Sequence, residues 1–256
     1  MEPNPAERVT SVASGAMTTA ALLDRGAAGL WGRRLPQLFA GFLVIGFGAA
    51  LLIEGDLGAS PWDVLHQGVA IHTPLSVGSA SIVLGLVVFL AWIPLRQRPG
   101  LGTVLNVLLL GPCIDLALLT LPTPGAIGWR VLYLVLGVVL FGAGGGLYIG
   151  AGLGPGPRDG VMTGIAARGP SISLVRTVIE ILAVAVGWAL GGTVGIGTVL
   201  VAVLVGPVVQ VSLRWSDLDT RRASRARDDT RGAGRPRDAS ARELRRIRDL
   251  GHSAVG

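Results

Sequence analysis

Two short segments of the chain place an aspartate two residues after a proline. Asp63 follows Pro61 and Asp159 follows Pro157, and each pair comes after a break rich in glycine. His66 stands three residues after Asp63, on the same face of a helix, which is the spacing of an acid–base pair. The second segment carries no histidine at the matching position, so this pair is not repeated. We therefore do not expect the protein to be an enzyme.

The same two segments have the features of a helix start. Ser60 suits the N-cap, and Pro61 and Pro157 suit the first helical position. Both aspartates can then simply satisfy the amides and the dipole at a helix N-terminus. Alternatively, the two short helices enter a membrane from opposite faces and present their N-termini to an anion. Trp62, beside Asp63, belongs to the same candidate site.

Other polar groups lie within strongly apolar stretches, where they need partners. Asn106 and Asp115 fall in one such stretch, and Asp115 has no partner in its own helix. Asp115 is therefore a candidate for a carboxylate that couples a cation or proton, or for a ligand of a helix end; an aspartate that reaches interfacial water is the alternative. Glu180 and Arg176 are spaced to neutralise each other. The candidate substrate-binding residues are Asp63, Asp159, Asn106, Asp115, Trp62 and His66, and we expect neither a metal nor a cofactor.

The composition indicates a membrane protein. Half of the 256 residues are hydrophobic and only 15% are charged, against about 25% charged in soluble domains. Six apolar segments are each long enough to cross a bilayer: 35–53, 76–95, 101–119, 129–149, 172–190 and 194–213. Between them, 60–72 and 157–168 predict helices too short to cross, which either re-enter the membrane or lie at its surface. We predict an all-α membrane protein with six transmembrane helices.

The charges divide the chain into three parts. Residues 1–34 form a disordered lead-in, 35–213 a six-span membrane domain with six arginines and six acids, and 214–256 an Arg-rich tail with a net charge of +5. With both termini in the cytoplasm, most arginines near the spans lie on the cytoplasmic side, as in membrane proteins generally. The basic tail then faces anionic lipid, with a short amphipathic helix near its end, and nucleic acid is not an expected partner.

The membrane domain contains an internal duplication. Residues 102–115 and 197–210 are identical at seven of fourteen positions, and 57–70 and 153–166 at six of fourteen, at offsets of 95 and 96. The halves, about 35–125 and 131–213, hold three spans each. An odd number of spans inverts the second half relative to the first, which is the architecture of many secondary transporters. Gly142, Gly146 and Gly150 form a small-residue face that we expect to pack the fourth span against the first.

Residues 57–68, 102–106 and 111–115 resemble the YczE branch of the YczE/YyaS/YitT family of bacterial integral membrane proteins. The resemblance covers about 35–213 and implies a multi-pass protein of the bacterial cytoplasmic membrane, without implying a substrate or a catalytic residue. Our first hypothesis is a transporter for a small molecule or ion. The alternative is a membrane accessory or scaffold protein that acts through a protein partner and transports nothing. Besides lipid, the partners that we consider are a second copy of the chain, as a homo-oligomer, and another protein.

Overall fold

The chain is entirely helical over the part that the structure describes. The computed structural model describes residues 30–216. Most of the expected lead-in and most of the Arg-rich tail, with its amphipathic helix, lie outside these residues. No strand occurs among residues 30–216, so the predicted all-α class is confirmed.

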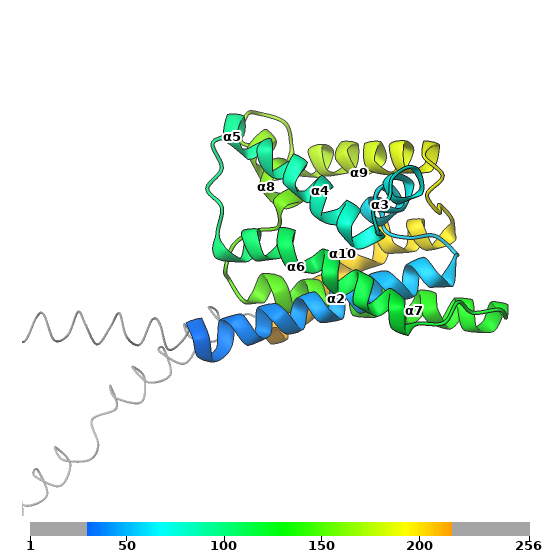
Figure 1. Cartoon of the computed structure of the whole chain (residues 1–256). Coiled ribbons are helices and arrows are strands. Elements are labelled where there is room, and N and C mark those ends of the chain that lie inside the picture. The colour runs from blue at the N-terminus through cyan, green and yellow to red at the C-terminus, as the bar shows by residue number, and fades with distance from the viewer. Residues whose placement is uncertain (1–29, 217–256) are drawn as a thin grey trace, which may run out of the picture. The chain divides into compact units, whose positions relative to one another are not determined.

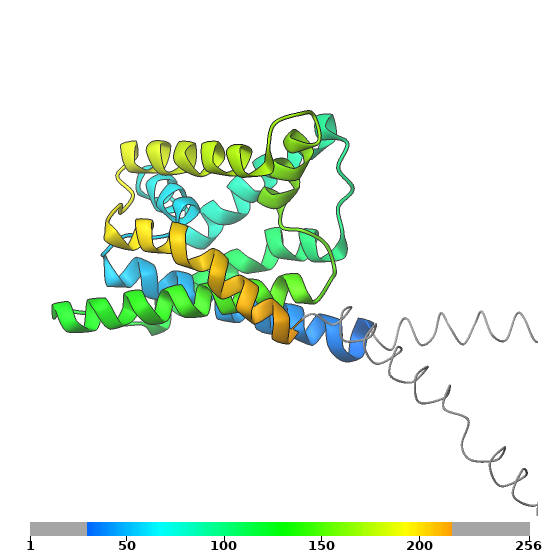
Figure 2. The same ribbon diagram turned by 180° about the vertical axis from the view of Figure 1, so that it is seen from behind.

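Six helices are long and apolar enough to cross a membrane (Figures 1 and 2). They span 18 to 24 residues with mean hydropathies of 1.8 to 2.2. Each corresponds to one span expected from the sequence. The first begins with a π-helical turn, η1 (Leu30–Arg34), and so starts before the expected boundary at residue 35. The six are α2 (Leu35–Gly55), α4 (Val77–Leu90) continued by α5 (Trp92–Leu95), α6 (Leu101–Thr120), α7 (Ile127–Gly150), α9 (Ile172–Ala189) and α10 (Ile196–Ser216).

Two shorter helices interrupt the series of spans. α3 (Pro61–His72) has 12 residues and α8 (Pro157–Ala166) has 10. At about 1.5 Å of rise per residue, neither helix can cross a bilayer. Each begins with a proline, and the residue just before that proline is extended: Ser60 before α3 and Gly156 before α8. The structure therefore has a short helix after the first span and another after the fourth.

α2 and α7 form the central helix pair, and glycines let them approach closely. A Cβ atom on Gly144 would lie 2.9 Å from the carbonyl oxygen of Gly41, and one on Gly137 would lie 3.1 Å from that of Gly48. Backbone atoms cannot move aside as a flexible side chain can, so a larger residue at either position would push the helices apart. Phe42 and Tyr148 pack beside this contact, with ring centroids 5.4 Å apart.

The face of α7 that carries Gly142, Gly146 and Gly150 packs helices together, but its partner differs from the one we expected. These glycines lie against Val208, Ser212 and Ser216 of α10, not against the first span. Ser212 and Ser216 donate hydrogen bonds to α7 carbonyl groups at 2.8 and 2.9 Å. The reason is that α7 carries two glycine faces, and the one with Gly137 and Gly144 contacts α2. The expected partner of the Gly142 face is therefore wrong.

Contacts between the two sequence halves occur in matching pairs. The amide of Gly197 at the start of α10 donates to the carbonyl of Leu57, and the amide of Gly102 at the start of α6 donates to that of Leu153, both at 2.8 Å. Leu57 and Leu153 are equivalent in the sequence repeat, as are Gly102 and Gly197. In each case, the loop before a short helix of one half packs on the last span of the other half.

The halves also differ in their packing. The second and third spans of the first half, α4 and α6, pack directly on each other, whereas α9 and α10 of the second half make no comparable contact within the described residues. α9 packs instead against the two short helices, α3 and α8. Figure 2 shows α9 lying along these short helices and apart from α10.

Candidate functional site

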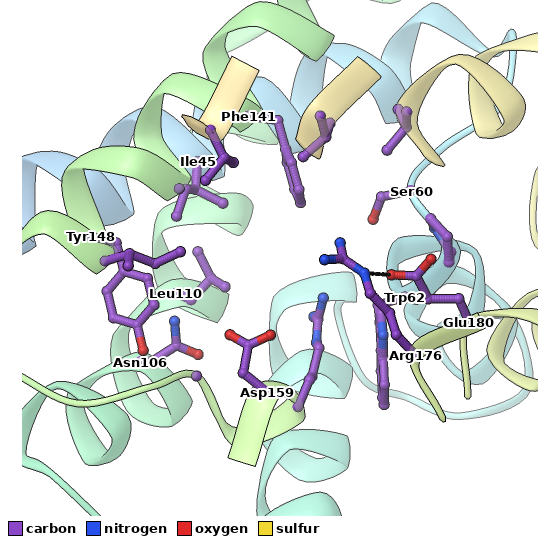
Figure 3. Close-up of a pocket in the computed structure, with 18 of the residues that line it drawn as sticks. Ile45, Ser60, Trp62, Asn106, Leu110, Phe141, Tyr148, Asp159, Arg176 and Glu180 are labelled. Atoms are coloured by element: carbon purple, nitrogen blue, oxygen red, sulfur yellow. Dashed lines mark hydrogen bonds and ion pairs between the residues drawn. The ribbon is translucent and has the colours of Figure 1, made fainter. Parts of the chain in front are cut away.

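A cavity of about 180 Å³ lies where the short helices meet the long ones (Figure 3). Five of the six spans contribute to its walls, all but α4, together with the first turns of α3 and α8. One wall is apolar, with Ile45, Leu110, Phe141 and Val205. The other side carries polar and charged side chains, so the cavity combines an apolar pocket with charged groups, as small-molecule sites do.

Both short helices direct their N-termini toward this cavity. Ser60, Pro61 and Trp62 of the first segment line it together with Gly156 and Pro157 of the second. Free amides at a helix N-terminus carry a partial positive charge equivalent to about half an elementary charge. The structure thus brings the two repeated Gly-Pro-Asp segments, which are about 96 residues apart in the chain, to the same place.

Hydrogen bonds from neighbouring helices hold the start of α8 in position. The indole nitrogen of Trp92 donates to the carbonyl oxygen of Pro157 at 2.8 Å, and the Thr103 hydroxyl donates to that of Pro155 at 2.7 Å. The Tyr148 hydroxyl donates to Gly154 at 3.2 Å. These bonds come from three different spans, so the first turn of α8 is fixed against the bundle.

The start of α3 is held by the loop before α10. The amide of Ala59 donates to the Thr193 carbonyl at 3.2 Å, and the Thr193 amide donates to the Gln67 side chain at 2.8 Å. Gly68 and Gly187 let α3 and α9 pack closely, because a Cβ on Gly187 would lie 2.5 Å from the Leu65 amide nitrogen. Residues of the second half therefore position the short helix of the first half.

Asp63 and His66 form a buried pair behind the cavity wall. Asp63 is 2% exposed and His66 is 1% exposed. The Asp63 carboxylate accepts a hydrogen bond from Ser60 Oγ at 2.5 Å, and its other oxygen lies 3.2 Å from His66 Nδ1. Ser60 Oγ also accepts a bond from the Asp63 amide at 3.3 Å, so Ser60 occupies the N-cap position of α3. Asp63 thus binds the N-cap side chain of its own helix and His66, and it does not line the cavity.

The charges around this pair set its protonation. Burial raises the pKa of Asp63, but the bond from His66 and the charge of Arg158 outweigh it, so that the pKa lies below its ordinary value. Burial also lowers the pKa of His66, and Arg158 adds to this effect, while Asp63 offsets it only in part. At neutral pH, Asp63 is therefore ionised and His66 is neutral.

Four side chains of charged residue types line the cavity: Arg158 and Asp159 from α8, and Arg176 and Glu180 from α9. Arg176 Nε donates to Glu180 at 2.9 Å, so these two neutralise each other. The Arg158 guanidinium lies over the Trp62 ring, 4.6 Å from its centroid. Figure 3 shows the Asp159 carboxylate on the side of Asn106 and Tyr148, across the open space from the Arg176–Glu180 pair. Burial raises the pKa of Asp159, and Arg158 and Arg176 offset this in part.

Of the six predicted candidate residues, Asp63 lies behind the cavity wall, and the other five divide into three groups. Asp159, Asn106 and Trp62 line the main cavity. His66 lines a smaller adjoining space that Trp62, Asn106 and Arg158 share. Asp115 lies elsewhere. It is a residue of α6, and its side chain meets the start of α4, where it accepts bonds from Ser76 Oγ at 2.6 Å and from the Gly78 amide at 2.8 Å. Asp115 is therefore placed as a ligand of a helix end, which is one of the roles considered for it, and it is not part of the cavity.

Arg158 is a cavity residue that was not among the predicted candidates, and Arg176 and Glu180 were predicted only as a local pair. The positive charge of Arg158 is consistent with a cytoplasmic position near a span, yet its side chain lines the cavity. Its place between Pro157 and Asp159, inside the repeated segment, was the available signal. No group of three or more His, Cys, Asp or Glu side chains in residues 30–216 is arranged to hold a metal ion.

The six apolar helices and the charged cavity among them define a multi-pass membrane protein. Residues 32–214 match the family model described as "Family of unknown function (DUF6198)", and the chain belongs to that family. The chain is 42% identical to an uncharacterized protein of Haemophilus influenzae over 171 residues, which cover 66% of this chain and 78% of the relative. No solved structure matches it.

Two further relatives come from Bacillus subtilis. The uncharacterized membrane protein YczE is 40% identical over 181 residues, which cover 70% of this chain and 84% of that protein. The uncharacterized protein YyaS is 26% identical over 178 residues, covering 67% and 88%. The resemblance to the YczE branch is therefore confirmed, and the name of the first of these relatives agrees with a location in a membrane.

Proposed function

We propose that the protein is a transporter for a small polar solute, and that the cavity between α3 and α8 is its substrate site. The observation that carries this proposal is that both short helices begin at one cavity inside the bundle, with their N-termini and several charged side chains at its wall. Discontinuous or half-crossing helices with N-termini at a central site are typical of secondary transporters. Polar backbone within a bilayer is tolerated where it lines a protein cavity.

The proposed architecture is a pair of inverted repeats. The exchanged contacts, Gly197 to Leu57 and Gly102 to Leu153, support it, because a two-fold relation between the halves generates contacts in such reciprocal pairs. The α2–α7 contact supports it as well. Gly41 meets Gly144, and Gly48 meets Gly137. In the repeat, Gly41 is equivalent to Gly137 and Gly48 to Gly144, so the two contacts are reciprocal. We place the protein in the bacterial cytoplasmic membrane, with both termini in the cytoplasm and no enzymatic activity.

Counterflow in proteoliposomes tests the transport proposal. The full-length protein is reconstituted, loaded with one unlabelled member of a panel of small amino acids, organic acids and amines, and supplied with the same labelled solute outside. We expect labelled solute to accumulate for at least one class. Arg158→Gln should reduce the initial rate about tenfold or more, because a positive charge that can bond the solute is lost from the site. Arg98→Gln, an exposed loop position, should leave the rate unchanged.

The result that contradicts the proposal is the absence of counterflow for every solute by a folded, reconstituted protein. If such a protein also retains a stoichiometric partner during purification in mild detergent, the accessory function is supported in its place.

A further inference from the structure

The cavity contains one positive and one negative side chain that form no ion pair with each other. Arg158 stacks on Trp62 and makes no hydrogen bond or ion pair with any of residues 30–216. Asp159 accepts a hydrogen bond from the Gly156 amide but forms no ion pair with an arginine in the described chain. Both side chains line the cavity and are accessible from it. Asp159 is exposed and Arg158 is half-buried at this wall, so a ligand in the cavity can pair with both charges.

We propose that the cavity binds a small zwitterion, with its carboxylate at Arg158 and its ammonium group at Asp159. The assignment deepens the proposed transport function by naming the substrate class, and its site is the same cavity. The lining side chains carry two positive and two negative charges, and the charge of Asp63, behind the wall, also acts on Arg158. A simple anion would leave Asp159 without an ion-pair partner, and a simple cation would leave the guanidinium of Arg158 without a hydrogen-bond acceptor.

The N-termini of the short helices and the side chain of Asn106 add to the polar contacts. The amides that begin α8 favour a carboxylate, and Arg158 is the second residue of that helix. Asn106 makes no hydrogen bond within residues 30–216, and its amide faces the cavity from the same side as Asp159 (Figure 3). Its side-chain oxygen can therefore accept a further bond from an ammonium group.

The size and the apolar wall limit the ligand. The cavity measures about 180 Å³, and a cavity of about 150 Å³ holds a ligand the size of benzene. The site therefore takes roughly six to ten non-hydrogen atoms. Phe141, Val201 and Val205 form the apolar part of the wall and suit a short aliphatic side chain. These limits match the smaller aliphatic amino acids, such as alanine and valine.

Isothermal titration calorimetry of the full-length protein in detergent tests the assignment. The ligands are L-valine, its analogue without the amino group (isovalerate) and its analogue without the carboxyl group (isobutylamine), with alanine, propionate and ethylamine as a second set. We expect a zwitterion of at least one set to bind, and each analogue to bind about tenfold or more weakly, because each leaves a charged group of the site without its partner.

Two variants separate the roles of the charged residues. Arg158→Gln should lower the affinities for the zwitterion and for the acid by similar factors. Asp159→Asn should instead lower the affinity for the zwitterion more than that for the acid, so that the two become nearly equal. A merely structural role would not change this ratio. Arg98→Gln and Asp56→Asn, at exposed positions outside the cavity, serve as matched controls, and Asn tolerates the positive φ of 52° at residue 56.

The outcomes distinguish this assignment from the transport proposal. If no zwitterion binds, or if isovalerate and propionate bind as tightly as valine and alanine, the assignment is overturned. If a zwitterion binds with the expected selectivity but undergoes no counterflow, the assignment stands and the transport proposal is overturned.

Discussion

At the scale of single residues, the two copies of the repeated segment have diverged in a chemically consistent way. Trp62 and Arg158 occupy equivalent positions, and so do His66 and Met162. In the structure Trp62 and Arg158 stack directly on each other. One copy thus supplies an aromatic surface and a buried Asp63–His66 pair, and the other supplies a cation and an accessible carboxylate. Identical copies of the segment would place the same residue at both positions, and the contact between an aromatic ring and a cation would not form there.

The buried histidine predicts a specific loss of stability in acid. The pKa of His66 lies below its ordinary value because burial and Arg158 disfavour the cation. The folded state therefore favours neutral His66, and this contribution is complete above the ordinary pKa of about 6.5 and decreases as the pH falls below it. We expect thermal unfolding in detergent to show a loss of stability between neutral and mildly acidic pH, by at most about 1.4 kcal/mol per pH unit from this group.

His66→Met, which copies the residue of the second segment, should reduce the steepness of this acid loss. The slope is compared with that of the wild type, because the substitution also removes a partner of Asp63 and changes the absolute stability. His72→Gln is the control, since His72 is exposed at the end of the same helix. Equal slopes in the wild type and His66→Met would contradict the prediction.

At the scale of the helices, α9 connects the cavity to the rest of the bundle. It packs on α3 and α8, and it carries Arg176 and Glu180 into the cavity wall. Its counterpart α4 is instead fixed to α6, where Asp115 binds Ser76 and the Gly78 amide. Gln210 stands at the position equivalent to Asp115 and is exposed. The carboxylate that joins α6 to the start of α4 therefore has no counterpart at residue 210 of α10.

The close approach of α2 and α7 predicts a strong effect of one methyl group. A Cβ on Gly144 would lie 2.6 Å from the Ile45 amide nitrogen and 2.9 Å from the Gly41 carbonyl oxygen. Gly144→Ala should therefore reduce the free energy of unfolding by about 1–3 kcal/mol, the usual cost of overpacking. Gly206→Ala in α10 is the matched control, because no atom lies within 4 Å of its Cβ position. Denaturation by SDS in mixed micelles measures both, and equal stabilities would contradict the interpretation.

The helices themselves were predictable because about 20 consecutive apolar residues suffice to mark a span, and Ser60, Pro61 and Pro157 marked the starts of the short helices. Their partners were not predictable. A span that is apolar on all sides does not indicate which face meets a neighbour, so the Gly142 face was assigned to the wrong helix. Arg158 was missed for a related reason: its charge was read from its place in the chain, whereas its role depends on α3 lying beside it.

At the scale of the whole membrane domain, the proposed inverted repeat makes the two short helices equivalent but opposite in direction. The turn after α3 and the turn after α8 are then on opposite sides of the membrane. With cytoplasmic termini, the α3–α4 turn faces outward, and the α8–α9 turn faces the cytoplasm, where Arg168 agrees with the preference of positive charge for that side. Parallel repeats would place both turns on the same side.

Cysteine labelling of intact cells decides between these arrangements. In a Cys113→Ala background, which removes the only cysteine of the chain, Thr73→Cys and Ala167→Cys place single thiols at exposed positions in the two turns. A membrane-impermeant maleimide should label position 73 in intact cells and position 167 only after permeabilisation. Gly125→Cys and Arg98→Cys, in loops that we place outside and inside, calibrate the assay. Labelling of both 73 and 167 from the same side would overturn the inverted repeat, and with it the argument that α3 and α8 enter the cavity from opposite faces.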